Sequence, residues 1–538
     1  MVSTSERPEP HKALFQYAYT RSSDQDAAPP VCHPIVIVGA GPVGLTAAID
    51  LALRGIPVVL LDDSDRIGDG SRGICYAKRS LEIWDRLGVG ERLVDMGVTW
   101  KLGKVFLGDE LVYSFDLLPE EGHKMPAFIN LQQFSLEKVL VDRACELDAI
   151  DLRWKNKVVG LEQRNDCVRL TIETPDGLYA LDAEWVIAAD GARSPARDML
   201  GLGFQGVTFE DKFLIADIKM AADFPTERRF WFDPQFHSGQ SALMHRQPNN
   251  VWRIDLQLGP EADVNEEQKP ERVLPRLRRM LGERDFELEW VSIYRFNCRR
   301  LERFVHGRVV FAGDSAHQVS PFGARGGNSG VQDAENLAWK LAAVLRGEAG
   351  AGLLESYNAE RVQAADENIA HSTRSTDFIA PRSPAERCLR NAVLALAPEA
   401  EFARRMVNSG RLSVATVHDS PLLTPDADGF DGSARLGAPI PDAPVRTAEG
   451  RDCYLLDVIP GAFTLLWVDD GGPKPDTHGL ESRVIGSDLI DLSGRLSQRL
   501  DCTPGATYLL RPDQHLCARW RRYDPATVDA ALARARGL

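Results

Sequence analysis

The stretch at residues 34–63 constrains the fold of this chain more than any other. It opens with the apolar, β-branched run Ile35–Val38, which is typical of a buried parallel strand. Three glycines follow in G-x-G-x-x-G spacing at Gly39, Gly41 and Gly44. In such a loop the first glycine permits the tight turn and the second lets the backbone approach a pyrophosphate. The third allows a helix to pack closely against the strand.

The residues after these glycines complete a strand–helix–strand unit. The pattern from Leu45 to Leu53 is helical, and Gly55 is placed to end the helix. A second strand, Val58–Leu61, leads into Asp62, where a carboxylate would hold ribose hydroxyls. The helix N-terminus offers unpaired N–H groups and the positive end of its dipole to phosphates. Because all these parts occur in register, we predict a dinucleotide-binding domain rather than a glycine-rich turn without a ligand.

A second glycine-rich stretch indicates that the dinucleotide is a flavin. The strand-like run 308–314 ends at Asp314, and small residues crowd 323–330 before a helix that Gly347 ends. Such a backbone can pass close to something planar, and the helix N-terminus points a positive dipole end at it. A reduced flavin carries negative charge at N1 and the C2 carbonyl, which this end would stabilise, whereas a nicotinamide dehydrogenase has no use for a second site.

Composition excludes several other classes of protein. The net charge of −15 argues against a nucleic-acid partner. The nine cysteines are scattered without a C-x-x-C pair, so we expect no metal site, no dithiol redox centre and a cytoplasmic location. No run approaches the roughly eighteen apolar residues of a membrane span, and the N-terminus shows no signal pattern.

The order of the expected elements divides this α/β chain into several domains. Strand-like segments separated by turn signals recur between residues 204 and 298, which indicates an antiparallel sheet inserted into the first domain as a wall for a substrate cavity. The expected division is an N-terminal extension at 1–33, a discontinuous FAD-binding domain at 34–203 and 299–372, a substrate-binding sheet at 204–298, a helical connector at 373–420 and a small α/β domain at 421–538.

Several motifs together resemble those of the class A FAD-dependent aromatic monooxygenases, the family of phenol hydroxylase and 3-(3-hydroxyphenyl)propionate hydroxylase. They are VIVGAGPVGL, a loop arginine at Arg72, Gln133 in Q-x-x-L-E, AADGARS, and AGDSAH followed by PFGARGGNSGVQDAENLAWKLA. The resemblance covers most of the chain. It implies a Rossmann-like FAD domain of the p-hydroxybenzoate hydroxylase type and, at the C-terminus, a thioredoxin-like domain that lacks the redox cysteines.

The resemblance also implies which residues hold FAD along its length. Those for the ADP part, the phosphates and the ribityl chain are Gly39, Gly41, Gly44, Asp62, Arg72, Gln133 and Asp314. Asp190 and Gly191 would serve both FAD and the transient nicotinamide cofactor. Those at the flavin ring are Pro321 beside it and Gly326, Gly327 and Asn328 toward N1 and the C2 carbonyl.

The activity that the resemblance implies is hydroxylation of a phenolic substrate. NADH or NADPH would reduce FAD, O2 would give a flavin C4a-hydroperoxide, and the aromatic ring would attack its distal oxygen. Two alternatives stay open: a tailoring monooxygenase that acts on a larger polyketide or antibiotic, and a flavin-binding module that does not activate O2. The resemblance is compatible with a homodimer.

Two questions stay open at the residue level. The chain has Arg325 where the family has a sequence closer to G-Q-G-x-N. This arginine either adds positive charge near the flavin N1 or reaches an anionic substrate, or else it points to solvent. The base that deprotonates the phenol is unknown. His237, His245 and His317 are candidates, although each alone is more typical of a structural or solvent-facing histidine.

Overall fold

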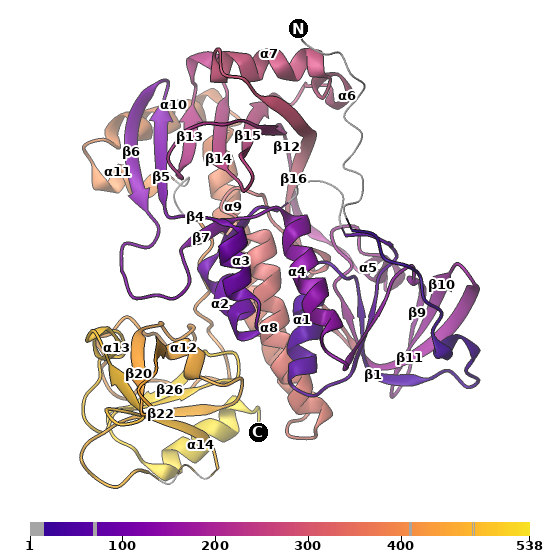
Figure 1. Cartoon of the computed structure of the whole chain (residues 1–538), viewed down its shortest axis with the longest axis vertical. Coiled ribbons are helices and arrows are strands. Elements are labelled where there is room, and N and C mark those ends of the chain that lie inside the picture. Colours follow the sequence, from indigo (N-terminus) through magenta and orange to yellow (C-terminus); the bar gives the residue numbers. More distant parts are fainter. Residues whose placement is uncertain (1–14, 68–72, 408–411, 476, 478) are drawn as a thin grey trace.

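A computed structural model describes residues 15–67, 73–407, 412–475, 477 and 479–538 (Figure 1). Its first sheet carries the predicted strand–helix–strand unit. The strand order is β17-β18-β11-β1-β2-β8, and β1 pairs in parallel with both β11 and β2. These strands are β1 (Cys32–Val38), β2 (Val58–Leu61), β8 (Ile150–Arg153), β11 (Gly177–Ala188), β17 (Val305–His306) and β18 (Val309–Phe311), with β9 (Lys157–Gln163) and β10 (Val168–Thr174) extending β11 as an antiparallel ribbon.

Helices cover this sheet because its strands are apolar on both faces. Helix α1 begins at Pro42, where proline lacks the N–H that a first helical turn leaves unpaired, and it packs against α8 and α4. The helices of this domain are α1 (Pro42–Leu53), α2 (Lys78–Arg86), α3 (Gly90–Met96), α4 (Gln133–Cys145), α5 (Pro195–Met199), α8 (Gly326–Leu345) and α9 (Leu353–Ile379). Together they bury a continuous apolar core around β1.

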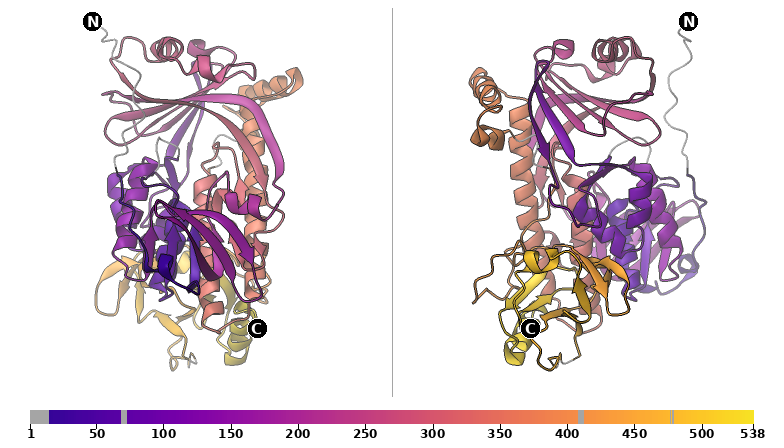
Figure 2. Two further views of the ribbon diagram at one scale, coloured as in Figure 1. Left: turned by 90° about the vertical axis from the view of Figure 1, so that its right-hand side faces the viewer. Right: turned by 60° about the vertical axis from the view of Figure 1, so that its left-hand side comes forward.

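A second sheet lies above the first domain, and Figure 2 shows α9 running up beside it. Its order is β19-β16-β12-β15-β14-β13-β5-β6. The strands are β5 (Leu102–Leu107), β6 (Glu110–Asp116), β12 (Gln205–Lys219), β13 (Arg228–Phe232), β14 (Ser241–Arg246), β15 (Val251–Leu258), β16 (Glu287–Arg300) and β19 (His317–Gln318). Strands β5 and β6 come from the interval that the sequence analysis left wholly within the FAD-binding domain, and β5 joins β13 in parallel.

The two faces of this sheet differ in composition. Helix α7 (Pro270–Leu281) packs on the outer face through Val273 and Leu277, beside the short α6 (Val264–Glu267). The inner face carries phenylalanines that meet the end of α9, where Phe232 and Phe378 lie edge to face with ring centroids 5.5 Å apart. A small sheet is formed by β3 (Cys75–Ala77), β7 (Phe128–Asn130) and β4 (Val98–Trp100). The inner face contacts it where His245 Nδ1 lies 4.0 Å from the Cys75 sulfur.

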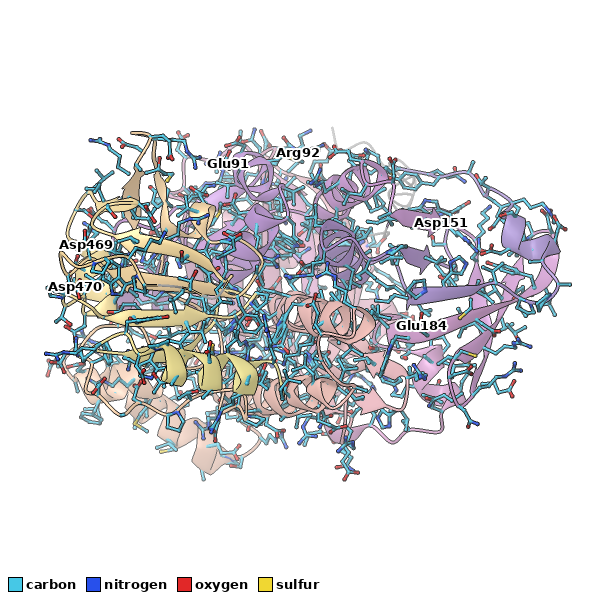
Figure 3. The ribbon with its side chains drawn as sticks, turned by 90° about the horizontal axis from the view of Figure 1, so that it is seen from below. Glu91, Arg92, Asp151, Glu184, Asp469 and Asp470 are labelled. Carbon is cyan, nitrogen blue, oxygen red and sulfur yellow. The ribbon has the colours of Figure 1, made fainter. Side chains whose placement is uncertain are left out.

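The C-terminal part of the chain forms a separate sheet with its own core. Helices α10 (Pro384–Leu396) and α11 (Glu401–Met406) precede it. Its strand order is β21-β20-β24-β23-β22-β25-β26. Its elements are β20 (Pro444–Thr447), β21 (Asp452–Tyr454), α12 (Leu455–Val458), β22 (Thr464–Val468), β23 (Glu481–Ile485), β24 (Leu489–Asp491), α13 (Arg495–Leu500), β25 (Thr507–Leu510), β26 (Leu516–Trp520) and α14 (Pro525–Ala535). Seen from below, this sheet lies beside the first domain, with Asp469 and Asp470 at its outer edge (Figure 3).

None of the helices in the described ranges has the length and apolar character needed to cross a bilayer. The nine cysteines are all unbridged thiols.

Candidate active site

The glycine loop between β1 and α1 has the geometry that its spacing predicts. Gly39 has φ +102°, and a Cβ there would lie 2.5 Å from the Ala189 carbonyl oxygen. A Cβ on Gly44 would lie only 1.9 Å from the Gly39 carbonyl oxygen, so α1 could not approach the loop. A Cβ on Gly41 would meet no protein atom within 4 Å. Packing thus requires the first and third glycines, while the second leaves backbone open to a ligand.

Asp62 stands at the end of β2 and faces the same loop. One carboxylate oxygen accepts the Ala40 N–H at 2.7 Å, and the other accepts the Ser64 N–H at 2.9 Å. Burial raises the pKa of Asp62 above its usual value, although these two N–H groups act to lower it. The carboxylate therefore holds the glycine loop and lies where a ribose would be expected.

Asp190 follows β11 on the other side of β1. Its Oδ2 accepts the Ala196 N–H at 2.9 Å, while its Oδ1 is buried without a hydrogen-bond partner among the described residues. Burial raises the pKa of this carboxyl group. Gly191 has φ +78° and leaves open space where a side chain would stand. A buried acceptor without a donor beside open backbone indicates a place for a ligand hydroxyl or N–H.

The first turn of α8 is the second predicted contact region. Asp314, in the short turn after β18, and Pro321 are both exposed. Gly326 and Gly327 begin the helix, no side chain caps its N-terminus, and a Cβ on Gly327 would meet nothing within 4 Å. The backbone N–H groups of this turn, with the positive end of a helix dipole behind them, are therefore accessible to an acceptor.

The side chain of Asn328 ties this turn to β3 and α2. Its Oδ1 accepts the Ala77 N–H and the Ser80 hydroxyl, both at 2.8 Å. Its Nδ2 donates to the Cys75 carbonyl at 3.0 Å and to the Ala324 carbonyl at 2.6 Å. Because the amide group has all these partners, Asn328 could face a flavin only through its backbone N–H.

Arg325 does not point to solvent, which removes one of the two alternatives left open by the sequence. The residue is 4% exposed. Its guanidinium donates to the Asn368 side chain of α9 at 3.1 Å and to the Leu412 carbonyl at 3.4 Å. The arginine thus joins the start of α8 to α9 and to Leu412 in the second half of the predicted helical connector.

The remaining predicted cofactor residues have mixed outcomes. Gln133 begins α4, where its Oε1 accepts the Gly73 N–H at 2.9 Å and its Nε2 donates to Glu137 at 2.7 Å. The amide therefore holds Gly73, the residue that follows Arg72 in the sequence. Arg72 itself lies outside the described residues.

The three candidate bases lie in different surroundings. His317 is buried and its Nε2 lies 2.6 Å from Asp333 in a network beneath α8. The Nε2 atom of His237 lies 2.7 Å from the Gln257 carbonyl, close to α7 on the outer side of the sheet. Only His245 faces the first domain, with its Nδ1 4.0 Å from the Cys75 sulfur. Burial holds the pKa of His245 well below its ordinary value, so the ring is neutral.

A comparison with known protein families decides the identity. The family described as an FAD binding domain matches residues 33–372, more than half of the chain. The chain belongs to the FAD-binding monooxygenase family. Its match spans the glycine loop, Asp62, Asp190 and the first turn of α8.

Individual relatives extend the match over nearly the whole FAD-binding monooxygenase. A flavin-dependent monooxygenase of Mycobacteroides abscessus is 30% identical and covers 90% of this chain and 96% of its own length. The 6-methylpretetramide 4-monooxygenase of Streptomyces rimosus is 30% identical over 93% of this chain and 92% of its own. Among solved structures, the flavin-dependent monooxygenase PieE in complex with FAD and substrate has a TM-score of 0.79, with 24% identity over 95% of this chain and 100% of its own.

The open backbone at Gly41, Gly191 and Gly327, together with the unpartnered Oδ1 of Asp190, fits FAD. The described residues gather no group of histidine, cysteine or carboxylate side chains that could hold a metal ion. Cavities of about 320 and 350 Å³ lie elsewhere, where the C-terminal domain of this monooxygenase meets the first domain.

Three further polar residues near this site were missed by the sequence analysis: the buried Arg228 and Arg253 and the half-buried Asp255. A signal for two of them was present in the strand VWRIDLQL. There Arg253, Asp255 and Gln257 alternate with apolar residues, which places three polar side chains on one face of a strand that is otherwise buried.

Proposed function

We propose that this monooxygenase inserts one oxygen atom of O2 into an aromatic ring that carries a hydroxyl group, with NADH or NADPH as the reductant. When bound, FAD supplies the electrons that activate O2. The observation that carries the proposal is the uncapped first turn of α8, which Asn328 fixes to Cys75, the residue that in turn contacts the inner face of the inserted sheet. An oxygen-activating group at this helix end would therefore lie beside a second domain able to hold a substrate.

The proposal assigns a part of FAD to each predicted site residue. The ADP part and phosphates would contact Gly39, Gly41, Gly44, Asp62, Arg72 and Gln133, and the ribityl chain would contact Asp314. Asp190 and Gly191 would lie against FAD and the nicotinamide cofactor, Pro321 against the flavin ring, and the backbone of Gly326, Gly327 and Asn328 against N1 and the C2 carbonyl. The positive helix end would stabilise the anion that forms on reduction.

The printed activities of relatives support an aromatic substrate. A hydroxylase of 3-(3-hydroxyphenyl)propionate and 3-hydroxycinnamic acid from Burkholderia vietnamiensis is 29% identical and covers 93% of this chain. The para-nitrophenol 4-monooxygenase of a Pseudomonas strain is 28% identical and covers 61%. Both enzymes are named for the oxygenation of an aromatic compound that carries a ring hydroxyl group.

Tailoring of a larger polycyclic phenol is the second candidate. The relatives that match the chain from end to end include the 6-methylpretetramide enzyme, and the fold of aklavinone-11 hydroxylase covers 94% of this chain. The structure of p-nitrophenol 4-monooxygenase covers only 72%. End-to-end correspondence is shared by the 6-methylpretetramide enzyme and the 3-(3-hydroxyphenyl)propionate hydroxylase, so it supports both candidates equally.

The test is NADH and NADPH oxidation by the FAD-loaded protein in the presence of simple phenols, phenolic acids and polycyclic phenols. We expect one class to accelerate oxidation and to gain one oxygen atom by product mass, with little peroxide. Acceleration by simple phenols alone would remove the tailoring candidate. A yellow protein that oxidises neither nucleotide with any of these compounds would refute the monooxygenase proposal and favour a flavin-binding module.

We further propose that the enzyme works in the cytoplasm as a homodimer. The nine unbridged cysteines suit a reducing compartment. Light scattering of the purified protein tests the dimer, and a monomer mass would contradict it.

A further inference from the structure

A row of polar side chains crosses the inner face of the inserted sheet. His245 of β14 lies directly opposite Arg253 of the neighbouring strand β15, and Arg253 lies directly opposite Asp217 of β12. On the other side of β14 runs β13, where Arg229 lies opposite Met244. Because the two strands are antiparallel, the next position along the register brings Arg228 opposite His245. Directly opposed residues project from the same face of a sheet. Asp255, two residues beyond Arg253, shares that face.

Most of this row is buried, and two of its members, Arg253 and Asp217, form an ion pair with each other. Arg253 is 3% exposed and binds Asp217 through two hydrogen bonds of 2.9 and 3.0 Å. Gln247 donates a further bond of 3.0 Å to Asp217. These contacts pair the single positive charge of Arg253 with the Asp217 carboxylate, as a buried ion pair requires.

Arg228 and Asp255 lack such partners. Arg228 is 6% exposed, yet its guanidinium forms no hydrogen bond or ion pair with a described residue, and its Nε is buried. Asp255 has a buried Oδ1 without a hydrogen-bond donor in the described part of the chain. Burying an unpaired charge or acceptor is costly, and native proteins do so chiefly where a ligand completes the site.

This pair lies close to the proposed flavin site. His245, next to Arg228 in the row, has its Nδ1 4.0 Å from the Cys75 sulfur. The carbonyl of Cys75 accepts from Asn328 in the first turn of α8 at 3.0 Å. Two residues, His245 and Cys75, thus connect Arg228 to the helix end, on the side where a substrate ring would lie.

We propose that Arg228 and Asp255 bind the ionisable hydroxyl of the aromatic substrate, and that Asp255 accepts its proton while Arg228 stabilises the resulting phenolate. This assignment rests on the proposed function. The O–H bond breaks, its electron pair stays on oxygen, and the proton moves to Oδ1 of Asp255. No oxidant or reductant is needed for this step, and the phenolate ring is the more electron-rich nucleophile.

The chemistry of the pair favours a hydroxyl group over a carboxylate. A hydroxyl oxygen accepts from Arg228 and its hydrogen is donated to Asp255, whereas a carboxylate would place a second anion beside Asp255. Burial raises the pKa of Asp255 to about 6, against the lowering effect of Arg253 and Arg228, and Asp217 raises it further. A carboxyl group of this pKa can take and release a proton near neutral pH.

The test begins with binding, measured apart from turnover. We would titrate FAD-loaded protein with 4-nitrophenol and follow the absorption of its phenolate, with benzoate as a competitor that lacks the hydroxyl. The variants are Arg228→Met and Asp255→Asn. The matched control is Arg229→Met on the same strand but the opposite face, where Arg229 contacts Glu227 and Phe224. Circular dichroism and FAD content check that each variant folds.

We expect Arg228→Met to weaken phenolate binding roughly tenfold or more, since it removes a charge-assisted hydrogen bond, while Arg229→Met changes it little. Asp255→Asn should bind phenolate at least as tightly. With the phenol that best accelerates NAD(P)H oxidation by the wild type, the wild-type kcat/KM should fall as the pH drops through about 6, where Asp255 becomes protonated. In Asp255→Asn that limb should move to the pKa of the free phenol.

The outcomes separate this inference from the proposed function. The hydroxyl assignment would be overturned if wild type and Arg228→Met bound 4-nitrophenol with equal affinity, or if benzoate bound the wild type as tightly as 4-nitrophenol does. Either result would overturn it even if the enzyme oxygenates aromatics. Arg228-dependent phenolate binding without any NAD(P)H oxidation would support the binding site and refute the monooxygenase proposal.

Discussion

At the scale of single residues, the glycine loop separates the demands of folding from those of ligand binding. Gly44→Ala would place its Cβ 1.9 Å from the Gly39 carbonyl, so we expect loss of soluble, folded protein. Gly41→Ala meets no protein atom within 4 Å and has a permitted φ of −77°. We therefore expect this variant to keep the melting temperature of the FAD-free protein while losing at least roughly tenfold in FAD affinity, because the methyl group obstructs the pyrophosphate.

Thermal unfolding of the apoprotein and flavin titration measure the two effects separately. If Gly41→Ala bound FAD normally, the second glycine would not face the cofactor, and the assignment of the loop to the pyrophosphate would be wrong.

The same scale shows where sequence reasoning stops. The spacing of Gly39, Gly41 and Gly44 predicted local geometry correctly because each constraint acts within a few residues of the chain. The environments of Arg325 and Asn328 were not predictable in this way. Asn328 bonds to Ala77 and Ser80, about 250 residues earlier, and Arg325 to Asn368 on another helix, so only tertiary structure determines these contacts.

At the scale of elements, α8 is fixed by one buried carboxylate. Asp333 accepts the Gly313 N–H at 2.9 Å and lies 2.6 Å from both His317 and Arg361. It thereby connects the turn after β18, the edge strand β19 and α9 to the helix whose first turn is the candidate flavin contact. Burial alone would raise the pKa of Asp333, but the charges of His317 and Arg361 hold it well below its usual value.

We predict that Asp333→Asn destabilises the protein by about 3 kcal/mol at neutral pH, because it leaves Arg361 buried without its counter-charge. A carboxyl group with a lowered folded pKa contributes stability that is fully present above its unfolded value of about 4 and is lost as the pH falls below it. The deficit of the variant should therefore shrink in acid. Urea unfolding at several pH values measures this, with Asp366→Asn on an exposed part of α9 as the control. A deficit independent of pH would contradict the electrostatic explanation.

The inserted sheet illustrates the same limit for elements. Its central strands were predictable from alternation and turn signals, since both are local. The membership of β5 and β6 was not, because β5 pairs with β13 more than 100 residues later and nothing in its own sequence specifies that partner. A strand pattern defines a face to be buried but leaves open which sheet buries it.

At the scale of the whole molecule, a buried charge network joins the C-terminal domain to α8 and α9. Arg511, which follows β25, donates to Glu360 of α9 at 2.6 and 3.1 Å. Asp513 accepts from Arg511 and from the Trp339 indole of α8, and Lys340 of α8 donates to Glu360 at 2.9 Å. The four charged groups of this network are fully buried and sum to zero, two positive against two negative.

This balance predicts that the C-terminal domain is a fixed part of the enzyme and not an independent appendage. Arg511→Met would leave the carboxylates of Glu360 and Asp513 with one positive charge of the network, that of Lys340, in place of two. Removing one partner of a buried network costs about 3–5 kcal/mol. We expect the variant to melt at a lower temperature and to be cleaved by protease within the 412–440 segment, while Arg446→Met, which breaks an exposed pair with Asp452, behaves as wild type. Because α8 also carries the candidate flavin contact, FAD should dissociate faster from Arg511→Met. Equal melting, proteolysis and FAD release in the two variants would mean that the domain is held by its apolar contacts alone.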